Sequence, residues 1–207
     1  MRLDEPLDDI FASATHVKVL RALCATPAEV GLSGRELARR AGVSHPRAGQ
    51  VLAGLAAQGV VTVHRLPRTD LYRLNRHHAL AGPLISLFEL EPRLKFDLLT
   101  FIAKEIKRRR LPVTEARIFG SAARGTMSST SDVDLALVTP SESASAVESI
   151  AQEIAETVRN RFGTRLNVLV GSPSLESLAA SGKAGRRVWK EIERDGMDVL
   201  AGSRAAR

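Results

Sequence analysis

The chain has 207 residues, and its basic residues outnumber its acidic residues to give a formal net charge of +7. This length is enough for two small domains, each able to bury a hydrophobic core. A single cysteine excludes an internal disulfide or a cysteine zinc site, and it suits a reducing compartment such as the cytoplasm. No stretch approaches the roughly 18 apolar residues of a membrane span, and the acidic start MRLDEPLDD is unlike a signal peptide, so no membrane partner is expected.

The positive charge is confined to the first part of the chain. Residues 113–207 carry equal numbers of basic and acidic side chains, so the net charge of +7 belongs to residues 1–112. A polyanionic partner is therefore expected for the N-terminal part of the chain.

Three helices are predicted near the N-terminus. Apolar residues at three- and four-residue intervals predict the first helix over residues 7–25. Ser33 and Glu36 have the spacing of a capping box, in which each side chain binds the backbone amide of the other residue. Ser44 is predicted to cap a third helix that ends at Gly59. The residues that this third helix should bury are Ala48, Val51, Leu52 and Leu55.

Two short strands are predicted after the third helix. Val61 and Val63 alternate with polar residues, and Tyr72 and Leu74 lie beyond a turn at residues 66–70. Three helices followed by a basic hairpin are typical of a winged helix-turn-helix. Residues 8–76, and above all the stretch SGRELARRAGVSHPRAGQVLAGLAAQGVV, closely resemble bacterial winged-helix transcription regulators of the MarR and ArsR type.

This resemblance implies that residues 1–80 form a winged helix-turn-helix domain that binds double-stranded DNA, with the third helix in the major groove. The exposed side chains of that helix that can read base edges are His45, Arg47 and Gln50. The expected phosphate contacts are Arg39, Arg40, Arg65, Arg68 and Arg73. Winged helices also serve as protein-docking or dimerisation modules, so the fold alone does not establish DNA binding.

Residues 81–112 are expected to form a helical connector. A short helix after Pro83 should end before Pro92, and a longer helix over about residues 93–109 should follow. The apolar stripe of the longer helix consists of Phe96, Leu99, Ile102, Ala103 and Ile106. This stripe could pack on the second domain or pair two subunits of a homodimer, and the sequence leaves both alternatives open.

Residues 113–207 alternate between strand and helix. Strands are predicted at residues 115–119, 131–138 and 164–170, and a long helix is predicted at residues 142–161. This pattern predicts an α/β domain with a mixed sheet. Together with the N-terminal domain, it gives a two-domain chain of the α+β class.

A compact motif lies in the stretch FGSAARGTMSSTSDVDLALV, which begins at residue 119. Because side chains alternate along a strand, Asp132 and Asp134 should project from one face, where two carboxylates suit Mg²⁺ or Mn²⁺. Gly120 lets a phosphate approach the backbone, Ser121 adds a hydroxyl group and Arg124 adds a positive charge. The sequence therefore predicts a metal and nucleotide site at these residues.

Gly-Ser, ten intervening residues and Asp-x-Asp resemble the signature of the minimal nucleotidyltransferases of the DNA polymerase β superfamily, over about residues 113–200. The resemblance implies Mg²⁺ and a nucleoside triphosphate, with ATP preferred. It also implies a third carboxylate on the strand after the long helix, which helps to bind the metal and to activate the attacking hydroxyl. This chain has Asn167 there, which offers a neutral oxygen but neither a charge nor a base.

Three functions are compatible with these patterns. The first is a DNA-tethered nucleotidyltransferase that moves a nucleoside monophosphate, such as AMP, to a hydroxyl group of a protein or a small molecule. The second is a transcription regulator whose degenerate transferase domain senses nucleotide or binds a partner. The third uses the winged helix to dock a substrate protein. Asn167 favours the DNA-binding regulator and argues against efficient transfer.

Overall fold

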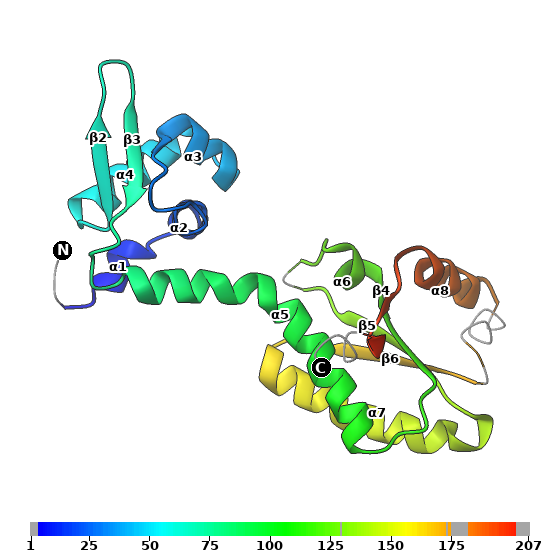
Figure 1. Cartoon of the computed structure of the whole chain (residues 1–207). Helices are drawn as coiled ribbons and strands as arrows, with labels where there is room; N and C mark the ends of the chain where they lie inside the picture. The colour runs from blue at the N-terminus through cyan, green and yellow to red at the C-terminus, as the bar shows by residue number, and fades with distance from the viewer. Residues whose placement is uncertain (1–3, 129, 173, 175–181, 202–207) are drawn as a thin grey trace. The chain divides into compact units, whose positions relative to one another are not determined.

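The computed structural model describes residues 4–128, 130–172, 174 and 182–201. The chain divides into two compact units, residues 1–92 and residues 93–207, and each unit is described by itself (Figure 1). Helices and strands occur in both units, so the chain is α+β, as predicted. Within the described residues, no helix is both long and apolar enough to cross a membrane.

The first unit begins with two helices where the sequence predicts one. The single helix expected over residues 7–25 is wrong, because Ser13 adopts an extended backbone and its hydroxyl accepts a hydrogen bond from the amide of His16 at 3.4 Å. A serine at this position competes with the helix for backbone hydrogen bonds and starts a new one. The helices of this part are α1 (Pro6–Ile10), α2 (Ala14–Cys24), α3 (Gly34–Ala41) and α4 (His45–Ala57).

The two predicted helix caps differ from expectation in detail. The hydroxyl of Ser33 accepts a hydrogen bond from the amide of Glu36 at 3.2 Å, as expected at the start of α3. The Glu36 carboxylate binds Arg39 and Arg40 rather than completing the capping box. Ser44 occupies the N-cap position of α4 but makes no side-chain cap hydrogen bond.

A small antiparallel sheet follows the helices of the first unit. It consists of β1 (Leu32–Ser33), β2 (Val61–Arg65) and β3 (Asp70–Leu74) in the order β1-β3-β2. The strand β1 has two residues, which is too short to produce an alternating sequence pattern. The predicted inward face of α4 is confirmed, because Ala48, Val51, Leu52 and Leu55 are all buried in the core of this unit.

The helix α5 (Ala81–Arg108) runs through Pro92, so the expected break at this proline is wrong. A proline inside a helix removes one backbone hydrogen bond and costs about 3 kcal/mol. Apolar burial on both sides of Pro92 offsets this cost. Leu84 and Phe88 belong to the core of the first unit, and Leu98 and Ile102 belong to the core of the second.

The apolar stripe predicted for this helix is partly wrong. Phe96 is 55% exposed, and Leu98 takes the buried position one turn before Ile102. Ile102, Ala103 and Ile106 are buried against the sheet of the second unit. These side chains are therefore core residues of the chain's own second unit.

The second unit contains the predicted mixed sheet. Its described strands are β4 (Glu115–Phe119), β5 (Val133–Val138), β6 (Leu166–Gly171) and β7 (Met197–Asp198), in the order β6-β5-β4-β7. The strands β5 and β6 are parallel, and the other pairs are antiparallel. The helical segments after β4 are α6 (Gly120–Arg124), the 3₁₀ turn η1 (Ser141–Ser143), α7 (Ala144–Phe162) and α8 (Gly182–Asp195).

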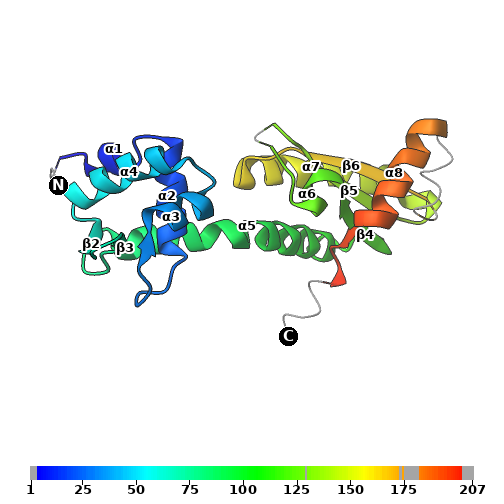
Figure 2. The ribbon, with the colours of Figure 1, turned by 90° about the horizontal axis from the view of Figure 1, so that it is seen from above.

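Different helices cover the two faces of this sheet. The end of α5 and the apolar side of α7 pack with Val133, Leu135 and Leu137 on one face. On the other face, Ala136 and Val138 pack with Ile192 of α8, and Val188 and Trp189 pack against the same cluster. Trp189 is therefore a packing residue, as expected. The short helix α6 lies beside α8 (Figure 1 and Figure 2).

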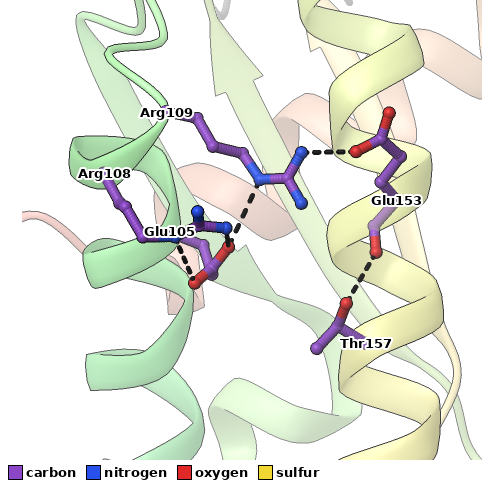
Figure 3. A network of polar contacts seen from close by, with 5 residues as sticks. All are labelled: Glu105, Arg108, Arg109, Glu153 and Thr157. Carbon is purple, nitrogen blue, oxygen red and sulfur yellow. Dashed lines mark hydrogen bonds and ion pairs between the residues drawn. The ribbon is translucent and has the colours of Figure 1, made fainter.

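A charged network ties the C-terminal end of α5 to α7 (Figure 3). Arg108 and Arg109 both bind Glu105 on α5, and Arg109 also binds Glu153 on α7. Thr157 donates its hydroxyl to the backbone carbonyl of Glu153 at 3.0 Å. The basic end of this helix therefore has partners within the protein.

Candidate functional site

The Gly-Ser turn brings the end of β4 against β5. Phe119 pairs with Asp134 in the antiparallel register, and Gly120 follows with a left-handed backbone (φ +70°). A Cβ atom at position 120 would lie 2.8 Å from Oδ2 of Asp134, which is closer than van der Waals contact allows. The backbone conformation therefore favours glycine here, and the absence of a Cβ atom leaves the Asp134 carboxylate in place beside the turn.

Asp134 is held by the side chain of Asn167. The two residues are register partners on β5 and β6, and Nδ2 of Asn167 donates a hydrogen bond to Oδ1 of Asp134 at 3.1 Å. A carboxylate oxygen accepts hydrogen bonds, so the amide must turn its N–H group to Asp134. Asn167 thus orients Asp134 and adds no charge.

Asp132 lies just before β5 and is exposed. It lines an open hollow of about 480 Å³ whose other lining residues are Met127, Ser128, Thr130, Ser131, Gly163, Thr164 and Arg165. Asp134 is half-buried and faces Gly120. The strand expected from residue 131 begins at Val133, because the preceding residues form a turn in which Ser131 binds Ser128.

The phosphate-binding groups expected after Gly120 lie on a very short helix. Because α6 has five residues, its dipole offers little attraction to an anion. Ser121 is half-buried at its start. Arg124 is bound to Asp195 of α8 at 2.8 Å, so this guanidinium already has an anionic partner. Hydrogen bonds from Arg194 and Arg124 hold the pKa of Asp195 well below its usual range.

The oxygen donors of this region fit a hard divalent cation. Mg²⁺ is commonly held by one or two carboxylates together with substrate phosphates. Gly120 leaves open the space next to Oδ2 of Asp134 that a Cβ atom would fill. Among the residues that the structure describes, no three His, Cys, Asp or Glu side chains form a preassembled metal cluster. A cation bound by Asp132 or Asp134 would complete its coordination with water or with substrate phosphates.

The helix α4 presents three polar side chains to solvent near its N-terminus. His45, Arg47 and Gln50 are all exposed. Arg47 borders an open hollow of about 830 Å³ together with Arg39 of α3 and Lys18 of α2. The geometry of α3, a tight turn at Gly42 and α4 is that of a helix-turn-helix.

Comparison with known families matches both units. Residues 13–69 match the model of the MarR family, and residues 100–172 match the model of a nucleotidyltransferase domain. The chain joins a MarR-family winged helix to a nucleotidyltransferase domain. No curated protein shows significant similarity to the chain. The nucleotidyltransferase match includes Gly120, Asp134 and Asn167, whereas α8 lies beyond it.

The wing of the MarR-family domain carries three of the expected arginines. Arg65 and Arg68 are exposed at the far end of the hairpin, where Arg65 pairs with Asp70 in the β2–β3 register. Arg73 is exposed at the base of the hairpin, where its guanidinium lies over Gly31. Arg65 and Arg68 are therefore better placed than Arg73 to contact a phosphate near the tip of the wing.

Two arginines of α3 are engaged by an acid of the same helix. Glu36 binds Arg39 through both carboxylate oxygens, at 2.9 and 2.7 Å, and binds Arg40 at 2.8 Å. These hydrogen bonds lower the pKa of Glu36 to about 2, and the bond from Arg39 contributes more than the bond from Arg40. Glu36 is therefore ionised at neutral pH and holds both arginines by charge-assisted hydrogen bonds.

The structure also shows two basic residues that the sequence interpretation missed. Lys18 lies beside Arg39 and Arg47, and Arg35 lines a hollow of about 550 Å³ with His45 and Arg68. Both hollows border α4. Helix packing places Lys18 of α2 and Arg35 of α3 at these hollows. In the sequence, the basic character of the two residues is the one signal that could have identified them.

Proposed function

We propose that the chain is a DNA-binding transcription regulator whose nucleotidyltransferase domain binds a nucleoside triphosphate together with Mg²⁺ or Mn²⁺. The observation that carries this proposal is the hydrogen bond from Asn167 to Asp134. It keeps one carboxylate oriented for a cation and puts a neutral amide where the family has a third carboxylate.

The DNA-binding part rests on the winged-helix domain. His45, Arg47 and Gln50 are exposed on α4, and arginines flank them on α3 and on the wing. Base edges in the major groove are read by side chains of this kind on a helix, and phosphates are bound by the flanking cations. A symmetric homodimer would read a palindromic site, and we propose this state for the regulator in the bacterial cytoplasm.

The nucleotide-binding part rests on Gly120, Asp132 and Asp134. A bound divalent cation would neutralise the triphosphate and stabilise charge in any transfer step. Asp132 and Asp134 would hold it, with Ser121 near the phosphates. ATP is the preferred nucleotide. In a transfer reaction, the acceptor oxygen bonds to the α-phosphorus, pyrophosphate leaves, and a base removes the hydroxyl proton.

Asn167 cannot be that base, because an amide does not accept a proton at neutral pH. General base catalysis typically contributes about 10²–10⁴-fold in rate, so we expect transfer to be slow. The alternative is an active transferase that moves a nucleoside monophosphate, such as AMP, to a hydroxyl group of a protein or a small molecule, with the winged helix used for targeting or docking. Arg124 binds Asp195 through one guanidinium nitrogen, so a phosphate would share this cation with Asp195.

The test uses the full chain and separates these functions. Binding of ATP should require Mg²⁺ or Mn²⁺ in calorimetry and should be lost in Asp134→Ala. Binding of duplex DNA should weaken steeply as salt rises. Label from α-labelled ATP should transfer slowly or not at all to copurified proteins. Rapid transfer by the wild type would favour the alternative, and absent DNA binding at low salt would contradict the regulator.

A further inference from the structure

The face of the sheet that carries Asp134 is covered by α8. Ala136, Val138 and Leu169 project to this face and pack with residues of α8. Side chains two residues apart on a strand share a face, so Asp134 and Asn167 also project toward it. The residues of the sequence motif lie within positions 120–134. The helix α8 begins at residue 182, so its residues lie far from the motif in the chain.

One acidic side chain of α8 reaches the site. The point where a Cβ atom at Gly120 would lie is 2.8 Å from Oδ2 of Asp134 and 4.0 Å from Oε2 of Glu191. The two carboxylates therefore border the same small space beside Gly120. One turn further along α8, Asp195 binds Arg124, which connects this helix to α6.

Glu191 has a second partner on the side away from Asp134. Its Oε1 accepts a hydrogen bond from Nε of Arg187 at 3.4 Å, and the Arg187 side chain is 84% exposed. An exposed ion pair of this length contributes little to stability. Its Oε2 atom is the one that faces Gly120 and Asp134.

We propose that Glu191 acts as a metal-binding carboxylate of the nucleotidyltransferase site and provides the negative charge that Asn167 lacks. Two carboxylates that face one space repel each other, and a divalent cation between them relieves this repulsion. One or two carboxylates plus phosphates are the usual ligands of Mg²⁺. The inference rests on the proposed function, because it assigns Glu191 to the same cation.

The test measures metal binding directly. Mn²⁺ is titrated into the full-length protein without nucleotide, and free Mn²⁺ is followed by electron paramagnetic resonance. Glu191→Gln should weaken Mn²⁺ binding about tenfold or more, because loss of a group that only supports a metal ligand already costs about 10–100-fold in affinity. Glu193→Gln changes an exposed acid two residues away on the same helix and should leave the affinity unchanged. Circular dichroism checks that both variants are folded.

A second variant separates metal binding from a purely structural role. Arg187→Gln removes the cation that competes for Glu191, so Mn²⁺ should bind more tightly. If the Glu191 carboxylate only forms an ion pair with Arg187, Glu191→Gln and Arg187→Gln will bind Mn²⁺ like the wild type. That result overturns the inference and leaves the proposed function standing. If the wild type binds no Mn²⁺ with or without ATP, the proposed function fails as well.

Discussion

Nδ2 of Asn167 donates a hydrogen bond to Oδ1 of Asp134 across the parallel strands β5 and β6, at 3.1 Å. This bond leaves Oδ2 of Asp134 directed to Gly120. An aspartate at position 167 would replace this hydrogen-bond donor with a second anion, so we expect the identity of residue 167 to change how the site responds to a divalent cation.

Asn167→Asp should make stability depend on the cation. Without Mg²⁺, the two carboxylates repel each other and should lower the free energy of unfolding by up to about 1 kcal/mol, since position 167 is exposed and water screens the charges. The melting temperature should fall by about 2–4 °C and recover when Mg²⁺ is added. Labelled transfer should also rise, because position 167 then has a charge and a base.

Asn160→Asp is the matched control, because it makes the same change on the exposed side of α7. Thermal melts of both variants with and without Mg²⁺ measure the difference. A wild type that transfers label rapidly and loses this activity in Asn167→Asp would show that Asn167 suits the mechanism of this site.

Gly120→Ala should abolish nucleotide binding at a modest cost in stability. Both Gly120 and Gly125 have φ +70°, so alanine at either position should cost about 1–2 kcal/mol of backbone strain. Only at position 120 does the new Cβ atom meet Oδ2 of Asp134, whereas nothing lies within 4 Å of a Cβ atom at Gly125. The carboxylate must rotate away from the cation. Calorimetry with Mg²⁺ and ATP should therefore show loss of binding in Gly120→Ala and its retention in Gly125→Ala.

Arg47→Ala and Arg68→Ala should weaken DNA binding in different ways. Arg47 lies on α4 and should read a base, so its loss should reduce discrimination between sequences by roughly 1–3 kcal/mol. Arg68 lies at the end of the wing and should contact a phosphate, so its loss should weaken all sequences alike and reduce the salt slope by about one. Fluorescence anisotropy with a selected site and a scrambled duplex, at several salt concentrations, measures both effects. Equal loss on both duplexes for Arg47→Ala would contradict base reading.

Glu36→Gln should strengthen DNA binding. The substitution releases Arg39 and Arg40 from the carboxylate that now binds them, and each released arginine that reaches a phosphate should steepen the salt dependence by about 0.9. Glu29→Gln removes an exposed acid elsewhere in the same unit and controls for net charge. If both variants bind DNA equally, Glu36 does not restrain the two arginines.

The thiol of Cys24 should be unreactive at neutral pH. Burial raises its pKa to about 11, and the nearby Arg76 only partly opposes this shift. At pH 8, about 0.1% of the thiol should be ionised, so alkylation should be slow and should speed up as pH rises toward 11. Because the pKa of Cys24 is higher in the folded state than in the unfolded state, the contribution of this thiol to the free energy of unfolding is constant at pH values below about 9. Above that pH the unfolded chain loses the thiol proton first, so this contribution falls as the pH rises. Iodoacetamide labelling followed by mass spectrometry, with a denatured control, measures the rate.

Much of the fold follows from local patterns. The buried face of α4 could be predicted from helical spacing, and the strand at residues 115–119 matches β4 at both ends. The predicted first helix was wrong because its apolar spacing continues across Ser13, and the capping preference of one serine is a weaker signal than a long stripe. The predicted break at Pro92 was wrong because burial at both ends of α5 outweighs one lost hydrogen bond.

Local sequence patterns were enough to identify the groups that β5 and the Gly-Ser turn can offer, because alternation along a strand and the left-handed preference of glycine are local properties. The partners of those groups become visible in the folded protein alone. The register of β5 against β6 pairs Asp134 with Asn167, the packing of α8 on the sheet brings Glu191 to Gly120, and Asp195 binds Arg124. These contacts join residues far apart in the chain, and their geometry depends on the packing of a whole core, which no local pattern encodes.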